Sequence, residues 1–215
     1  MAGVDISEQI NGLGGIATSS ELKSAGFSAG AIAYALETGS IDRLTRGVYC
    51  APDVFEDDFA IISYRWCKCV FSHASALYLL GLSDRLPSEQ HVTVPRGYNP
   101  KGLKNAYPGI GMHWVSSELY PLGETTVKTP VGNTVRCYDA ERSIADLIRQ
   151  RKRDGADAQL VRDSVTGYFK RADKDLPKLA EMCEALGVRD ELQVPSSLRC
   201  ARRSGSGRSC RSTWR

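Results

Sequence analysis

The most constraining feature of this sequence is a run of short apolar patterns between Gly14 and Asp53, GGIATSSELKSAGFSAGAIAYALETGSIDRLTRGVYCAPD. The stretch SELKSA predicts a short helix that Ser19 or Ser20 caps and that Gly26 ends. AGAIAYALETG predicts a second helix, which Ser28 caps. Two short helices joined across a tight glycine-containing turn form a helix-turn-helix. The apolar face of the second helix consists of Ile32, Ala35 and Leu36.

The next stretch, IDRLTRGVYCA, alternates around Arg46 and Gly47 and predicts a β-hairpin. The second helix of a helix-turn-helix can lie in the DNA major groove, and a hairpin beside it, called a wing, can contact phosphates. Arg43 and Arg46 are the cations of this wing. The candidate DNA-binding residues of the segment are Ser19, Ser20, Lys23, Ser28, Ala31, Tyr34, Arg43, Thr45 and Arg46.

The charge of this segment argues against strong electrostatic capture of DNA. Residues 1–52 hold three basic and five acidic residues. The same apolar spacing also fits any small three-helix domain. From the residues alone, a DNA-binding module and a purely structural domain therefore stay equally open.

The net charge of the whole chain, +3, is set by its C-terminal end. Six of the 28 basic residues and none of the 25 acidic ones lie between residues 196 and 215, so residues 1–195 hold 22 basic and 25 acidic residues. The basic balance is thus no sign that the folded body binds nucleic acid. No secretory signal or membrane-spanning run is visible, and we expect a cytoplasmic protein without a membrane partner.

The rest of the chain mixes helical and strand patterns. Residues 59–66 and 72–80 look helical, the second with Ser72 as N-cap, and EQHVTVP and GMHWVSS predict strands. TTVKTPVGNTVRCY predicts a β-hairpin that leads into a helix capped by Asp139, and two further helices are expected over 156–169 and 173–187. We expect these middle and third segments to share one core. The predicted class is α+β: a winged helix-turn-helix over 1–52, a larger mixed α/β domain over 53–192, and a basic tail over 193–215.

No catalytic, metal or cofactor site emerges from the motifs. His73, His91 and His113 lack the spacing of metal ligands, and we expect each to be a structural histidine. The seven cysteines are odd in number, and we expect reduced thiols rather than a disulfide framework. No phosphate-binding glycine motif or nucleophile elbow occurs in the folded body.

A long loop, VPRGYNPKGLKNAYPG, carries cations and aromatic residues together. Such a loop can hold a phosphate backbone, so Arg96, Lys101 and Lys104 are further candidate DNA contacts. The alternative is a solvated surface loop without a ligand.

Three stretches in order, GGIATSSELKSAGFSAGAIAYALETGSIDRLTRGVY, FSHASALYLLGLSD and YDAERSIADLI, resemble the AbiEi-type antitoxins of bacterial type IV toxin–antitoxin systems. The resemblance covers Ile6 to Glu191. After Glu191 the sequence departs from the family pattern. We expect the residues after it to be disordered or a frame-shifted end, or alternatively a basic arm, and we assign them no site.

The resemblance implies a repressor with two roles. The winged module is expected to bind inverted repeats in double-stranded DNA upstream of its own operon, as a dimer on DNA. The second domain is expected to counter a nucleotidyltransferase-like toxin of an abortive-infection (phage defence) system, without a stable complex and without enzymatic activity. The alternative is a ligand-responsive regulator, or an enzyme, whose α+β domain holds a small molecule.

Overall fold

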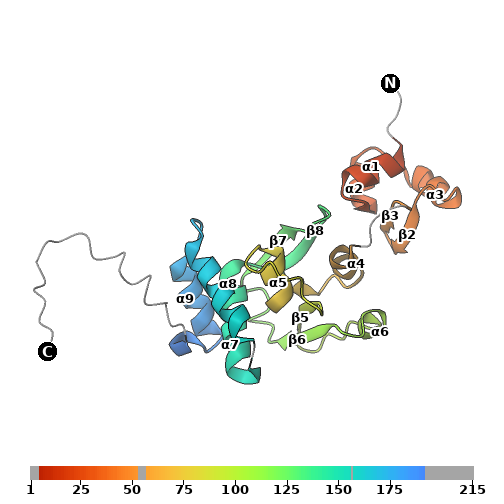
Figure 1. Cartoon of the computed structure of the whole chain (residues 1–215). Coiled ribbons are helices and arrows are strands. Elements are labelled where there is room, and N and C mark those ends of the chain that lie inside the picture. The colour runs from red at the N-terminus through yellow and green to blue at the C-terminus, as the bar shows by residue number, and fades with distance from the viewer. Residues whose placement is uncertain (1–4, 53–56, 156, 192–215) are drawn as a thin grey trace, which may run out of the picture.

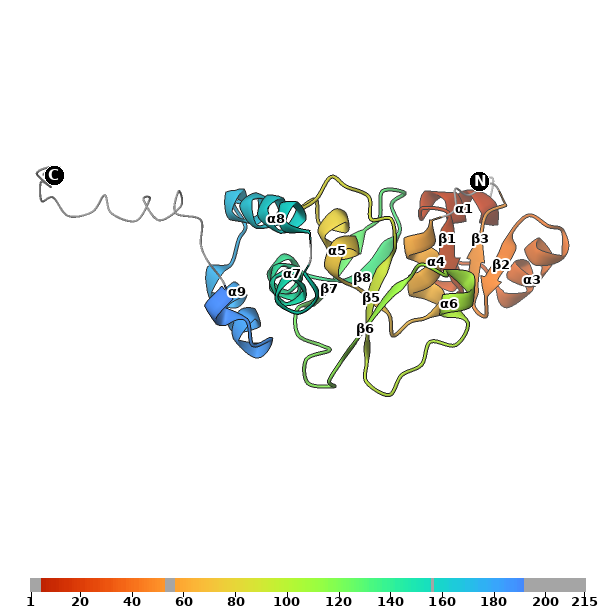
Figure 2. The same cartoon turned by 60° about the horizontal axis from the view of Figure 1, so that its bottom comes forward.

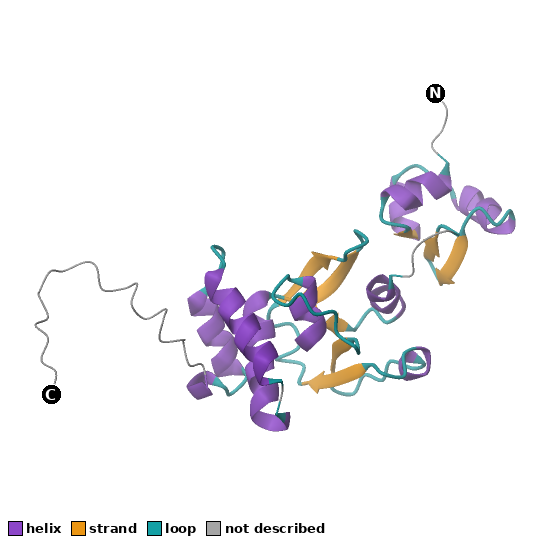
Figure 3. Ribbon diagram, viewed as in Figure 1, coloured by secondary structure: helices purple, strands orange, loops and turns teal. Residues whose placement is uncertain are grey.

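The computed structural model describes residues 5–52, 57–155 and 157–191. This part of the chain contains both helices and strands (Figures 1 and 3), which confirms the predicted mixed fold. The predicted tail over 193–215 and Ala156, the first residue of one expected helix, lie outside the described residues. No helix in the described ranges is long and apolar enough to cross a membrane.

The N-terminal part has six short elements. In order they are α1 (Ile6–Gly12), β1 (Ile16–Thr18), α2 (Ser19–Ser24), α3 (Ala29–Glu37), β2 (Asp42–Thr45) and β3 (Val48–Cys50). The three strands form an antiparallel sheet in the order β1-β3-β2. The two central helices and the hairpin follow the prediction, whereas α1 and β1 were not predicted. β1 is three residues long, which is too short to show an alternating pattern.

The larger part is built on a five-stranded mixed sheet in the order β6-β5-β4-β8-β7. Its strands are β4 (Val70–Phe71), β5 (His91–Pro95), β6 (Gly111–Val115), β7 (Glu124–Lys128) and β8 (Thr134–Tyr138). Its helices are α4 (Asp58–Arg65), α5 (His73–Leu79), α6 (Leu103–Ala106), α7 (Ala140–Asp154), α8 (Ala158–Lys170) and α9 (Leu176–Ala185), followed by a 3₁₀ turn, η1 (Arg189–Glu191). The predicted hairpin is β7–β8, and Asp139 caps α7 by accepting a hydrogen bond from the Arg142 N–H at 2.8 Å.

The core is divided by this sheet. α5, α7, α8 and α9 lie on one side and α4 and α6 on the other (Figure 2). One buried cluster joins α5 to α7–α9, and a second joins the sheet to α4 and α6. The expectation that the middle and third segments share a core is confirmed by the first cluster, which joins α5 and α7 of the middle segment to α8 and α9 of the third. The sheet separates this shared core from the second cluster, which surrounds α4 and α6 (Figure 2).

The winged sheet is packed onto the larger part. Ile16 and Val48 belong to the same buried cluster as Phe59 and Ile62 of α4. A third cluster, which includes Leu22, lies between the N-terminal helices and their sheet. The N-terminal elements therefore have a core of their own and also share one with α4.

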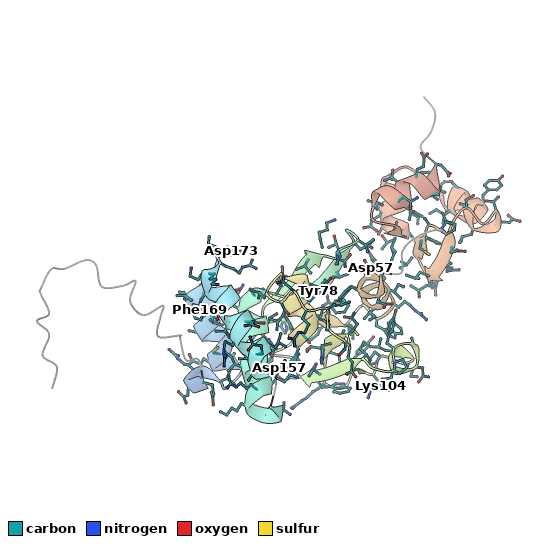
Figure 4. All side chains as sticks on the ribbon, in the orientation of Figure 1. Asp57, Tyr78, Lys104, Asp157, Phe169 and Asp173 are labelled. Carbon is teal, nitrogen blue, oxygen red and sulfur yellow. The ribbon has the colours of Figure 1, made fainter. Side chains whose placement is uncertain are left out.

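Asp57, at the start of α4 (Figure 4), strengthens this junction. Its buried carboxylate accepts hydrogen bonds from Thr129 Oγ1 at 2.6 Å and from Asn133 Nδ2 at 2.8 Å, and it also caps α4. Asn133 in turn packs so closely against Gly14 that a Cβ atom there would lie 3.0 Å from Asn133 Oδ1. The network thus connects α4, the β7–β8 turn and the N-terminal segment.

Candidate nucleic-acid interface

The chain enters α2 through Thr18. Its Oγ1 accepts a hydrogen bond from the Glu21 N–H at 3.2 Å, and the Glu21 carboxylate accepts one from the Thr18 N–H at 2.7 Å. This reciprocal pair is a capping box, which satisfies two open amide groups at the helix start. The prediction that Ser19 or Ser20 caps this helix is wrong, because Thr18 has the glutamate at the required spacing of three residues.

α3 presents one face to solvent. Ser28 caps it as predicted, with Oγ accepting a hydrogen bond from the Ala31 N–H at 3.1 Å. Ile32 and Ala35 are buried in the N-terminal core, whereas Ala31 is exposed and Tyr34 is 68% exposed. Serine hydroxyls and alanine methyl groups are among the groups that contact base edges in the major groove. The exposed face therefore has the chemistry of a recognition helix, although it carries no cation.

β2 and β3 form the predicted wing. Arg43 lies opposite Tyr49, and the strand register shifts between Arg43 and Thr45, which marks a bulge that twists the hairpin. Arg46 and Gly47 make the turn, where Gly47 has a φ of +79°. Arg43 and Arg46 are exposed, and within the described residues neither has an ion-pair partner.

Ser19 ties the start of α2 to the wing turn. Its N–H donates to the Gly47 carbonyl at 2.8 Å, and its Oγ lies 3.3 Å from the same oxygen. Ser19 is half-buried, so its role in the structure is to position the wing, and its contact with DNA stays a prediction. Of the other candidates, Ser20 and Lys23 are exposed and Thr45 is half-buried.

Helix-turn-helix and wing thus occur together, joined by a hydrogen bond. Residues 11–52 match the family described as transcriptional regulator, AbiEi antitoxin. The predicted resemblance to AbiEi-type antitoxins is therefore confirmed over the segment that holds α2, α3 and the wing. The five-stranded sheet and α7–α9 lie outside this match. The comparison with curated proteins gave no match.

The three candidate cations of the long loop over residues 94–109 lie in two different places. Lys104 is an exposed residue of α6 (Figure 4). Lys101 is exposed just before this helix, and its carbonyl accepts a hydrogen bond from Trp66 Nε1 at 2.9 Å. Arg96 lies at the other end of the loop, where its N–H bonds to the Val115 carbonyl at 2.8 Å. It lines a cavity against α7, so the three predicted cations do not form one surface patch.

Three histidines outside the matched residues 11–52 lie in contact with one another at the larger sheet. The rings of His73 and His113 stack with their centroids 3.6 Å apart, and His91 Nδ1 lies 3.1 Å from His113 Nε2. Sequence reasoning missed this cluster, because it depends on the pairing of β5 with β6. Across the described ranges, no group of three or more His, Cys, Asp or Glu residues is placed to hold a metal ion.

Ser72 occupies the predicted N-cap position of α5 but makes no side-chain cap. Its Oγ instead accepts a hydrogen bond from Thr93 Oγ1 at 2.8 Å and lies 3.0 Å from His73 Nδ1. The capping role predicted for Ser72 is therefore wrong, because its hydroxyl is turned into the buried polar group beside the sheet. Burial lowers the pKa of His73 to about 3, with His91 and nearby arginines adding to the shift, so its imidazole is neutral at physiological pH.

Proposed function

We propose that this protein is an antitoxin that binds DNA through α3 and the wing and represses its own operon. The observation that supports it best is the joint placement of an exposed α3 face, centred on Tyr34, and a wing whose turn Ser19 holds. The match of residues 11–52 to antitoxin transcriptional regulators supports the same proposal.

The charge of the N-terminal segment indicates how it binds. Residues 1–52 hold three basic and five acidic residues, so one copy gains little from long-range attraction to phosphates. Two copies on an inverted repeat double the phosphate contacts of Arg43 and Arg46. Lys101 and Lys104 add further contacts in this proposal.

The sharpest test of base recognition is footprinting on the DNA upstream of the protein's own gene. We expect two protected half-sites for the wild-type chain. Tyr34→Ala should change which bases matter, because Tyr34 lies on the face that enters the major groove in this proposal. Tyr34→Phe is the matched control, since it keeps the ring and removes only the hydroxyl. Absence of protection by the wild-type chain would contradict the proposal.

We further propose that residues 1–52 carry DNA binding and residues 53–192 counter a nucleotidyltransferase-like toxin without a stable complex. Because Ile16 and Val48 pack against α4, deletion of the first segment would expose apolar surface. The full-length variant Tyr34→Ala/Arg43→Ala/Arg46→Ala avoids this problem. It should restore growth of toxin-expressing cells while repression of the operon is lost. A folded variant that leaves the cells poisoned would show that the two roles are inseparable.

A regulatory rather than catalytic role agrees with the family match. A ligand-responsive regulator is a second proposal, and a cavity between β6 and α7 favours it. An operator affinity that changes when the cavity is filled would support this second proposal.

A further inference from the structure

A cavity of about 290 Å³ lies between β6, an edge strand of the larger sheet, and the C-terminal half of α7. Arg149 and Arg153, one helical turn apart on α7, line it together with Arg96, which follows β5. His73 and His113 of the histidine cluster line it as well. Three guanidinium groups and two imidazoles from four segments of the chain therefore meet at one hollow.

The positive charge of this cavity is not neutralised. Within the described ranges, Arg96, Arg149 and Arg153 have no carboxylate within ion-pair distance. The one acidic residue of the lining, Asp146, is buried and accepts a hydrogen bond from Arg142 Nε at 3.0 Å. Its main charge partner, Arg142, lies outside the lining, and it also attracts Arg149. Three guanidinium groups thus face one carboxylate, and an anion that entered would meet a net positive site.

Helix electrostatics account for only part of this arrangement. Arg151, Lys152 and Arg153 lie in the last turn of α7, where cations complement the helix dipole. That effect does not explain Arg96, which comes from another element, nor why Arg149 and Arg153 share the side of α7 that bears Asp146. Arg151 lies in the same turn and does not line the cavity, so it serves as a matched control.

We propose that this cavity binds the phosphate group of a small phosphorylated molecule. Planar guanidinium groups bind phosphate oxygens in pairs of charge-assisted hydrogen bonds. The volume of about 290 Å³ lies just below the ~300–1,000 Å³ typical of ligand sites, which favours a compact ligand over a dinucleotide. This site goes beyond the DNA-binding and antitoxin roles and does not depend on them.

Two features support a preformed site. His73 adopts a φ of +50°, a left-handed conformation that is rare outside glycine and is found at ligand-binding sites. Its neutral imidazole, stacked on His113, adds hydrogen-bonding capacity without adding charge. Specificity for an anion then depends on the three arginines.

The test is calorimetric titration of the full-length protein with inorganic phosphate, pyrophosphate and adenosine monophosphate. Wild type should bind at least one probe. Arg149→Gln/Arg153→Gln should weaken that binding by roughly a hundredfold, because a hydrogen bond to a charged group is commonly worth tenfold or more. Arg151→Gln/Arg162→Gln removes the same charge from exposed positions outside the cavity and should bind like wild type. Melting without ligand checks that both variants fold.

Each outcome decides the proposal. Equal binding of phosphate and adenosine monophosphate would support recognition of the phosphate alone, and stronger binding of the nucleotide would support a phosphorylated metabolite. No binding of any probe to the wild type at millimolar concentration would overturn the site. An equal loss of phosphate binding in the control variant would also overturn it. So would a loss of DNA binding in Arg149→Gln/Arg153→Gln while phosphate binding stays unchanged. Footprinting of the wild type tests the DNA-binding proposal separately.

Discussion

His73 lies in surroundings that are unfavourable for a charged histidine. It is buried, its backbone is left-handed, and it lies against His91, His113 and Ser72. Burial, His91 and two nearby arginines all disfavour the imidazolium form. Protonation of this ring therefore destabilises the folded protein relative to the unfolded chain.

The stability of the protein should consequently fall as the pH is lowered. The pKa of His73 is about 3 in the folded chain and about 6.5 in an unfolded one. The unfolded state therefore binds the extra proton first, and stability is lost as the pH falls below about 6.5. The lowered pKa of His91 acts in the same direction, whereas the raised pKa of buried Asp146 opposes it.

His73→Asn isolates the contribution of this residue, because asparagine tolerates a left-handed backbone and does not titrate. Between about pH 7.5 and pH 5 its melting temperature should fall less than that of the wild type. Melting curves across this range measure the difference. Parallel curves for the two proteins would show that His73 does not carry the acid sensitivity.

At the scale of elements, the wing turn packs against Ser19 at the start of α2. Gly47 has a φ of +79°, and a Cβ atom there would lie 3.4 Å from Ser19 Oγ, the group that holds the turn. Gly39 has a similar φ of +71° with no atom within 4 Å of a Cβ position. The two glycines thus share the backbone strain of a substitution and differ in the contact.

We predict that Gly47→Ala and Gly39→Ala each lower the free energy of unfolding by about 1–2 kcal/mol. Only Gly47→Ala should also weaken operator binding, because the substituted residue lies in the wing turn next to Arg46 and Ser19. Urea unfolding and fluorescence anisotropy with operator DNA measure the two effects. Equal operator affinity for the two variants would show that the wing turn does not contribute to binding.

The elements that the sequence predicts well are those with local signals. Ser28 and Asp139 cap their helices as expected, and both hairpins have turn residues at the right places. The strands β1 and β4 were missed because two or three residues show no period. The roles of Ser19 and Ser72 were misjudged because each hydroxyl bonds to a partner far along the chain, Gly47 and Thr93.

At the scale of the whole molecule, the same limit applies to the candidate sites. Helix-turn-helix and wing lie within 40 consecutive residues, so their pattern is visible in the sequence. The phosphate cavity needs Arg96, His113 and Arg149 to meet, which depends on the order of strands and on how α7 packs. No local sequence pattern predicts that these three residues line one cavity.

The two candidate sites also lie in different parts of the molecule. The winged module is at one end, with α7, α8 and α9 at the other (Figures 1 and 2). Arg162 on α8 is exposed and has no ion pair within the described part of the chain. It therefore carries the same free charge as the wing arginines, but its helix lies far from the wing (Figures 1 and 2), which makes it a control for them.

A salt titration of operator binding decides whether the wing contacts DNA phosphates. Wild type, Arg46→Ala and Arg162→Ala are compared as full-length proteins. Removal of one phosphate contact should lower the slope of log affinity against log salt by about one unit, and should weaken specific and random DNA alike. We predict this change for Arg46→Ala and a wild-type slope for Arg162→Ala. A wild-type slope for Arg46→Ala, or the same reduction in both variants, would contradict the account.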